Sequence, residues 1–183
     1  MAFVDVALWW TDLRTADLSV AATLPAAERE RLHELSDQTE RGRRLAGALL
    51  LQHAVRQARA LDSDEPVEID RTCSECGAQH GRPVVADGLG PHVSVSHSGL
   101  VIAVATCAEA AVGVDVERLA PDTPPATAAE LRDWVEHEAR MKAALAADET
   151  ATIQPLTCPF EGYVAALAVA TPSGIRVREH FLQ

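Results

Sequence analysis

The chain has 183 residues, of which 48% are hydrophobic and 23% are charged, and its formal net charge is −11. This length and composition allow one compact domain or two small halves that share a core, and they argue against a disordered chain. The acidic balance disfavours binding of nucleic acid or of an anionic membrane, because both need a basic surface.

The sequence predicts no targeting or membrane-spanning segment. No apolar run approaches the roughly 20 residues that a membrane-spanning helix needs. The first residues read Met-Ala-Phe-Val-Asp and lack the basic start and continuous apolar core of a secretory signal. We therefore expect a cytoplasmic protein that does not enter a membrane.

The first third of the chain predicts a strand followed by two helices. Residues 3–10 are rich in β-forming residues and partly alternate, which is typical of a strand. A short helix is expected over 25–35 and a longer one over 39–61. The middle of the longer helix is apolar on nearly all sides, so we expect it to be buried on several sides. Residues 66–70 predict a further short strand.

A turn-rich segment with a Cys-x-x-Cys pair follows. Cys73 and Cys76 are followed by His80, and two cysteines at this spacing can begin a zinc knuckle. A complete knuckle needs four ligands, and the other cysteines, Cys107 and Cys158, lie far along the chain. A zinc site, a redox pair and reduced thiols in a turn are all compatible with the sequence, and reduced thiols are the favoured interpretation.

The middle of the chain predicts strands joined by short turns. Residues 92–96, 100–106 and 110–117 each read as a strand, so we expect an antiparallel meander. The segment 119–126 contains several prolines and breaks the pattern. A helix with a possible capping box at its start is then expected over 127–147.

The tail adds strand-like runs at 162–170 and 174–178. The order of helices and strands predicts an α+β (α/β) fold and is compatible with two similar halves, 1–106 and 107–183, joined around residues 107–110. Each half is expected to be a small, largely antiparallel sheet packed with a long helix.

Two acids lie on one predicted strand face. Asp115 and Glu117 are two residues apart, and side chains at that spacing leave a strand on the same side. Taken alone, such a pair is more often a solvated face than a site.

The helix that follows places two charges on its apolar side. At about 100° per residue, Glu138 and Lys142 fall within about 20° of Leu131, in the sector that also holds Trp134 and Val135. Burying an unpaired charge costs several kcal/mol. The two charges therefore either pair with each other or point into a polar cleft shared with the strand acids. The nearby acids favour the cleft.

Together these acids form a candidate metal site. Asp115, Glu117 and Glu138 supply hard oxygen ligands, which suit Mg²⁺ when waters and substrate phosphates complete its coordination. Donors for such phosphates are also present. Ser96 and His97 stand beside a glycine-containing turn, and a bidentate guanidinium is available close by in the sequence, at Arg82. The sequence predicts a magnesium site for a substrate that carries a pyrophosphate.

Three segments resemble, in order and in internal spacing, the three motifs of the 4′-phosphopantetheinyl transferases of the surfactin-synthetase-activating type. These are residues 93–99, 112–117 and 134–142. Weaker similarities extend the likeness from the N-terminus to about residue 145, and they lie at residues 3–10, 43–50 and 81–83. The resemblance implies a pseudo-dimer of two similar α/β halves with the active site between them.

The family transfers the 4′-phosphopantetheine arm of coenzyme A to a serine of an acyl or peptidyl carrier protein. By position, the resemblance implies that Asp115, Glu117 and Glu138 bind Mg²⁺ on the pyrophosphate of CoA. Glu138 would also help to deprotonate the carrier serine, and Lys142 would stabilise the leaving phosphate. It thus implies a magnesium-dependent transferase that works in a biosynthetic pathway, with CoA as substrate and a carrier protein as partner.

The same resemblance implies that Arg43, Arg82, Ser96 and His97 hold the phosphates of CoA. No nucleic-acid or membrane partner is expected, and a monomer is one option for the oligomeric state.

Both halves depart from the family pattern. His137 replaces the usual Lys, Ser94 replaces the usual Asn, and Gln52 stands where a second basic residue is expected. The segment 118–133 is about half the expected length, and an alanine-rich run replaces the Gly-x-Gly after Lys142. A divergent homologue that catalyses a different acid/base reaction without CoA is therefore the alternative, followed by a non-catalytic binding protein.

Overall fold

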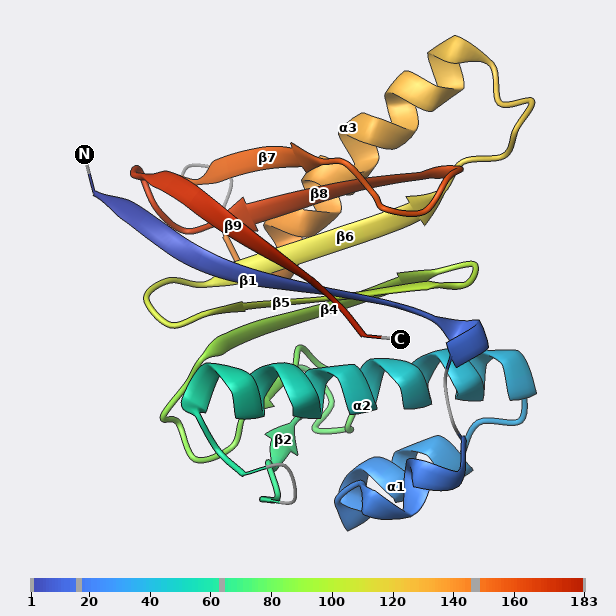
Figure 1. Cartoon of the computed structure of the whole chain (residues 1–183), viewed down its shortest axis with the longest axis vertical. Helices are drawn as coiled ribbons and strands as arrows, with labels where there is room; N and C mark the ends of the chain where they lie inside the picture. Colours follow the sequence, from blue (N-terminus) through green and yellow to red (C-terminus); the bar gives the residue numbers. More distant parts are fainter. Residues whose placement is uncertain (1, 16–17, 63–64, 146–148, 183) are drawn as a thin grey trace.

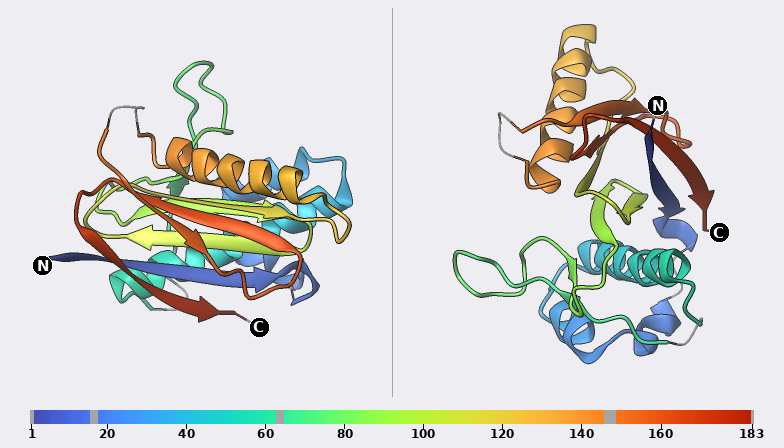
Figure 2. Two further views of the ribbon diagram at one scale, coloured as in Figure 1. Left: turned by 90° about the horizontal axis from the view of Figure 1, so that it is seen from above. Right: turned by 90° about the vertical axis from the view of Figure 1, so that its left-hand side faces the viewer.

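The computed structural model describes residues 2–15, 18–62, 65–145 and 149–182. The fold is a mixed α+β arrangement in four layers: one long helix, a four-stranded sheet, a three-stranded sheet and a second long helix (Figures 1 and 2). The predicted α+β class is confirmed at this level. The internal twofold relation between two halves remains a prediction.

The described helices and strands follow one another along the chain as alternating small groups. The helices are α1 (Ala26–His33), α2 (Gln38–Arg59) and α3 (Pro125–Lys142), with short 3-10 helices at Leu13–Thr15 and Leu18–Thr23. The strands are β1 (Phe3–Asp12), β2 (Ile69–Asp70), β3 (Val84–Val85), β4 (His92–Ser98), β5 (Val101–Cys107), β6 (Val112–Arg118), β7 (Thr152–Leu156), β8 (Tyr163–Val169) and β9 (Gly174–Phe181).

The four-stranded sheet has the order β4-β5-β1-β9 and the three-stranded sheet has the order β6-β8-β7. Neighbours are antiparallel except β1 and β9, which run parallel. The chain therefore returns to its first strand at its end (Figure 1). The division into 1–106 and 107–183 stays a prediction, although β9 joins the sheet formed by the first half.

The expected meander over 92–117 is correct for β4 and β5 and wrong for β6. β4 and β5 pair antiparallel, with Val95 opposite Val104, but β6 begins the other sheet and pairs with β8. The physical reason is burial. Residues 112–116 are all buried, because β6 packs against α3 on one face and against the four-stranded sheet on the other.

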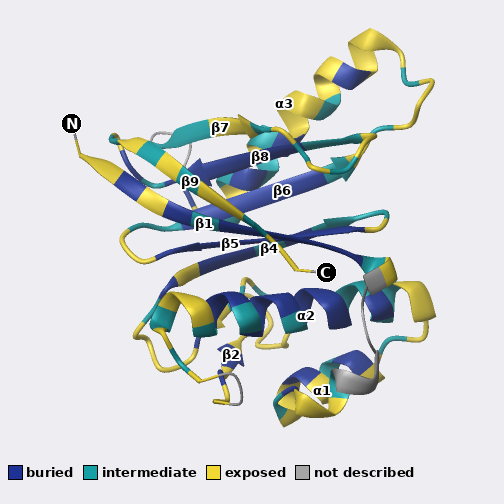
Figure 3. Cartoon of the chain, viewed as in Figure 1, coloured by how far each residue is buried: buried dark blue, intermediate teal, exposed yellow. Residues whose placement is uncertain are grey.

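The main core lies between the two sheets. It contains alternate residues of β1 and β5, such as Leu8, Trp10 and Ala103, against Val114 of β6 and Leu167 of β8. The opposite face of the four-stranded sheet packs on α2. This helix is buried over most of its middle, as the sequence predicted (Figure 3). Its N-terminus is capped by the side chain of Asp37, which accepts a hydrogen bond from Glu40 N.

α3 covers the three-stranded sheet through its small residues. Val135, Ala139 and Ala143 are buried against Ala166 and Ala168 of β8. Opposite them lies Gly113 of β6, at a very close approach of helix and strand: a Cβ atom added to Gly113 would lie 1.9 Å from Ala139 O.

This contact corrects the predicted apolar face of α3. Trp134 was expected to point inward, but it is 52% exposed. The helix turns its alanines toward the sheet because only small side chains allow the backbones to meet at Gly113. Glu138 and Lys142 are consequently half-buried at the margin of the interface and not at its centre. The first turns of α3 extend beyond the sheet (Figure 3).

None of the helices in the described ranges combines the length and the apolar composition that crossing a bilayer requires.

Replacing Gly113 by alanine tests the close approach of α3 and β6. The added methyl group meets the helix backbone and forces α3 away from the sheet, so we expect a loss of about 3 kcal/mol or more in the free energy of unfolding, measured by urea denaturation. Gly47→Ala in α2 is the matched control. Its Cβ would lie 3.4 Å from the nearest atom, so this helical substitution should stabilise by roughly 0.5–1 kcal/mol. Equal stability of the two variants would contradict the contact.

Candidate functional site

A row of three serines joins the two sheets. Ser94, Ser96 and Ser98 alternate along β4, so their side chains leave the same face of the strand. Their hydroxyl oxygens accept hydrogen bonds from three backbone N–H groups of β6, those of Val114 (3.0 Å), Val116 (3.2 Å) and Arg118 (3.0 Å). β6 is the edge strand of its sheet, so these hydroxyls satisfy N–H groups that no neighbouring strand pairs. We call this feature the serine row.

Asp115 stands at the centre of the serine row. The residue is only 3% exposed, and its Oδ1 accepts hydrogen bonds from Ser96 Oγ (2.8 Å) and from Lys142 Nζ (2.5 Å). Lys142 Nζ also donates to Ser96 Oγ at 3.0 Å. The three side chains therefore form a closed triangle that connects β4, β6 and α3. A buried carboxylate at this position needs such a cation, because an unpaired charge there is strongly unfavourable.

The second oxygen of this carboxylate has a different environment. Asp115 Oδ2 is buried and has no hydrogen-bond partner. Buried polar atoms without a partner are rare in proteins and often mark a place where a ligand, water or ion binds. A carboxylate oxygen accepts and cannot donate when ionised, so the missing partner is a donor or a cation. An ionised carboxylate oxygen is the kind of ligand that Mg²⁺ prefers, and the magnesium ion itself remains a prediction.

The other two predicted metal ligands do not form one close group with Asp115. Glu117 Oε2 accepts from Ser98 Oγ at 2.8 Å, and Glu138 is half-buried on α3. In the described part of the chain, one group of three or more His, Cys, Asp or Glu side chains has its ligand atoms within 4.8 Å of one another, and these three acids are not that group. Lys142 forms its ion pair with Asp115. The magnesium site therefore stays a prediction whose ligands the structure gathers only in part.

A second cluster of polar side chains joins the start of α2 to the end of β4. Arg43 Nε donates to Gly99 O at 2.8 Å, and its guanidinium lies 3.6 Å from Glu40 Oε2. Glu40 Oε1 also pairs with Arg44 Nε at 2.7 Å and lies 3.9 Å from His97 Nε2. The structure thus brings together two of the predicted phosphate ligands, Arg43 and His97. It adds Glu40, an acid that the sequence analysis missed although its four-residue spacing from Arg44 predicts an ion pair.

Burial and the neighbouring charges together determine the protonation of the His97 imidazole. Burial lowers the pKa of His97, and the positive charges of Arg44, Arg43 and Lys142 lower it further, against the opposing effect of Glu40. Burial alone would raise the pKa of Glu40, but its partners outweigh that effect and lower it. At neutral pH the cluster therefore holds a neutral imidazole and an ionised carboxylate.

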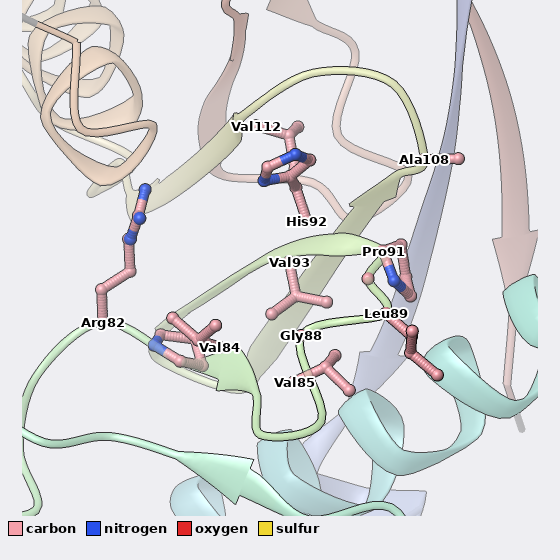
Figure 4. Close-up of a pocket in the computed structure, with 12 residues that line it drawn as sticks. Arg82, Val84, Val85, Gly88, Leu89, Pro91, His92, Val93, Ala108 and Val112 are labelled. Carbon is pink, nitrogen blue, oxygen red and sulfur yellow. The ribbon is translucent and has the colours of Figure 1, made fainter.

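Arg82 lies in a different place. It is exposed and lines a pocket of about 240 Å³ together with Pro83, His92 and Leu89 (Figure 4). Its side chain extends away from the backbone of the loop at one end of this pocket. None of the other predicted phosphate ligands lines the same pocket.

Neither a protein-family model nor a curated protein matches this chain.

The serine row predicts a graded loss of stability. Ser94→Ala leaves the buried N–H of Val114 without an acceptor, so we expect a loss of about 1–3 kcal/mol in the free energy of unfolding. Ser98→Ala exposes the N–H of Arg118 to solvent, which can replace the hydroxyl, and should cost less than about 1 kcal/mol. Urea denaturation of both variants measures the difference. A Ser94→Ala protein as stable as the wild type would show that the row does not hold the sheets.

The lowered pKa of His97 predicts a pH dependence of stability. The unfolded chain takes up a proton near pH 6.5, whereas the folded chain does so only at lower pH. Stability should therefore fall as the pH drops below about 6.5 and level off below the folded pKa. His97→Gln should reduce that slope. His53, whose pKa is also lowered by burial, contributes equally to both proteins, so the difference between their curves isolates His97. Parallel curves would exclude the effect.

Proposed function

We propose that this chain is a magnesium-dependent 4′-phosphopantetheinyl transferase, which transfers the phosphopantetheine arm of coenzyme A to a serine of an acyl or peptidyl carrier protein. One observation carries the proposal: Asp115 is buried beside Ser96 and Lys142, and one of its oxygens has no partner. These three residues come from the three segments that resemble the family's motifs. Their meeting at one carboxylate is what a common site for those motifs requires.

Each residue of this site has a defined task in the proposed reaction. Asp115, Glu117 and Glu138 would hold a Mg²⁺ ion on the pyrophosphate, and the ion would supply the positive charge that the developing phosphate oxygens need. Glu138 accepts the proton of the carrier serine, directly or through a water. The serine oxygen then forms a bond to the phosphorus next to the pantetheine arm, and the bond to the bridging oxygen of 3′,5′-ADP breaks. Lys142, on the same helix one turn later, neutralises the charge on that leaving group.

The cluster at the start of α2 provides contacts for a further phosphate of CoA. Arg43 and His97 lie beside the glycine turn after β4 and share Glu40 as their partner. A phosphate that enters this cluster replaces Glu40 as the acceptor for the guanidinium, which can bind two phosphate oxygens at once. Arg82 would contact a phosphate of CoA from the separate pocket that it lines.

The surface beside Glu138 suits a protein partner. Trp134 and Met141 are 52% and 56% exposed, and their spacing of seven residues places them on one face of α3. Glu138 lies between them in sequence and one turn from each. Carrier domains are generally acidic, and so is this chain, so an apolar contact is more favourable than a broadly electrostatic one.

The alternative remains a divergent homologue that performs a different acid/base reaction without CoA. Two observations favour it: the three acids do not gather within 4.8 Å of one another, and Glu40 occupies the cations that would bind phosphate. Titration calorimetry with CoA in the presence of Mg²⁺ separates the two functions. Binding supports the transferase, and no binding by folded protein supports the alternative.

The transferase itself is tested by incubating the protein with CoA, Mg²⁺ and a panel of apo carrier proteins and measuring the mass of each carrier. Glu138→Gln and Asp115→Asn should lower the rate of transfer by roughly a hundredfold or more. Glu136→Gln is the matched control, because it removes a carboxylate from the same helix outside the site, and it should leave the rate unchanged. No mass increase on any carrier, with CoA bound, would count against transfer.

A further inference from the structure

The loop between β2 and β3 brings together three side chains that the proposed function does not use. Cys73, Cys76 and His80 are a group of potential metal-binding residues whose ligand atoms all lie within 4.8 Å of one another. Cys76 Sγ and His80 Nε2 are 3.0 Å apart. Both cysteines are free thiols.

The backbone of this loop is folded into a tight knuckle around the three side chains. Gly77 N donates to Cys73 O at 2.9 Å, and Cys73 N donates to Ala78 O at 2.8 Å. Gly77 has a φ of +74°, which glycine adopts without strain and which lets the chain reverse directly after the second cysteine. The reversal carries His80 back to the two sulfurs.

The base of the loop is closed by a second glycine. Gly81 N donates to Arg71 O at 2.7 Å, and a Cβ atom at Gly81 would lie 2.8 Å from Thr72 O. The two ends of the segment therefore cross at a distance that only glycine permits. The knuckle is a closed unit that projects from the body of the protein (Figure 2, green loop).

Apolar packing does not hold this unit in its conformation. No residue from 71 to 83 is buried. Fixing the backbone of one residue costs about 1–2 kcal/mol in conformational entropy, and an exposed loop has no hydrophobic gain to offset that cost. A metal ion bound by three side chains of the loop is the kind of cross-link that small exposed units use in place of a core.

We propose that Cys73, Cys76 and His80 bind one Zn²⁺ ion, with a water molecule as the fourth ligand. Two thiolates and one imidazole are ligands that favour Zn²⁺ over the hard cation of the candidate active site. Binding releases the two thiol protons to solvent, and the neutral imidazole coordinates through a ring nitrogen. No cysteine outside the loop takes part.

The distances fit this assignment. With Zn–S of about 2.3 Å, Zn–N of about 2.0–2.1 Å and tetrahedral angles, a coordinated sulfur and nitrogen lie about 3.5 Å apart. Cys76 Sγ and His80 Nε2 need to separate by only about 0.5 Å from their present contact to reach that value. The backbone N–H groups of Glu75 and Cys76 also lower the pKa of the Cys73 thiol, which favours the thiolate that a metal binds.

The proposed zinc site does not depend on whether the protein is a transferase. It closes the loop directly before Arg82, so it also fixes the start of the segment that lines the pocket of Figure 4. Its test uses metal content and spectroscopy alone, and failure of the transfer assay leaves it unaffected.

The experiment begins with protein purified under reducing conditions with added Zn²⁺, followed by removal of loosely bound metal with a weak chelator. Mass spectrometry of the metal should find one zinc ion per chain. Cobalt substitution should give the sulfur-to-metal charge-transfer absorption of a thiolate site and the visible bands of a tetrahedral one. X-ray absorption at the zinc edge should report two sulfur ligands, one imidazole nitrogen and one oxygen.

Variants locate the ion. Cys73→Ser and Cys76→Ser should lose the zinc and the charge-transfer absorption, and His80→Ala should lose the zinc to the chelator that the wild type resists. Cys158→Ser and His33→Asn are matched controls, because they remove a cysteine and a histidine outside the loop, and both should keep the metal.

Three results would overturn the proposal. The first is wild-type protein that retains no zinc and shows no thiolate absorption with cobalt. The second is zinc that persists in both Cys73→Ser and Cys76→Ser. The third is a Cys73–Cys76 disulfide whose reduced form fails to bind zinc, which would identify a redox pair.

Discussion

The rest of the structure depends on the way β4 and β6 are joined. The two strands belong to different sheets, and side-chain hydroxyls bridge them where a backbone ladder would otherwise be needed. A hydroxyl can accept and donate at once, whereas a carbonyl can only accept. Ser96 uses both capacities: it accepts from Val116 N and donates to Asp115. The contact that stacks the sheets is therefore also the contact that orients the central carboxylate of the candidate site.

The second constraint is the height of α3 above its sheet. The contact of Gly113 with Ala139 sets that height, and Lys142 lies less than one turn beyond the alanine. Lys142 reaches Asp115 at 2.5 Å only because the helix backbone comes so close to β6. A larger residue at the contact would raise the helix and separate the ammonium from the carboxylate. The ion pair between Lys142 and Asp115 therefore depends on the packing of small residues, because that packing brings the helix close enough to the strand.

The sequence predicted the parts of the site that follow from local geometry. The spacing of Asp115 and Glu117 on a strand, and the burial of the middle of α2, depend on periodicity alone and needed no knowledge of the partner elements. The orientation of α3 was predicted wrongly, because the apolar face was defined by the large apolar residues. Trp134 was therefore placed on the inward face. The closest approach is in fact set by a glycine on another strand. The contact of Glu40 with His97 and the placement of β6 in the second sheet likewise depend on tertiary neighbours, which local spacing does not encode.

Both candidate binding sites contain internal ion pairs. Asp115 is paired with Lys142, and Arg43 and Arg44 beside His97 share the carboxylate of Glu40. Under the proposed function, a ligand therefore displaces a partner that is already bound. A metal ion alone would have to compete with Lys142, and a phosphate alone would have to compete with Glu40. A metal and a pyrophosphate that arrive together release Lys142 and supply it with a new anionic partner in the same step, so the internal pairs favour joint binding over either ligand by itself.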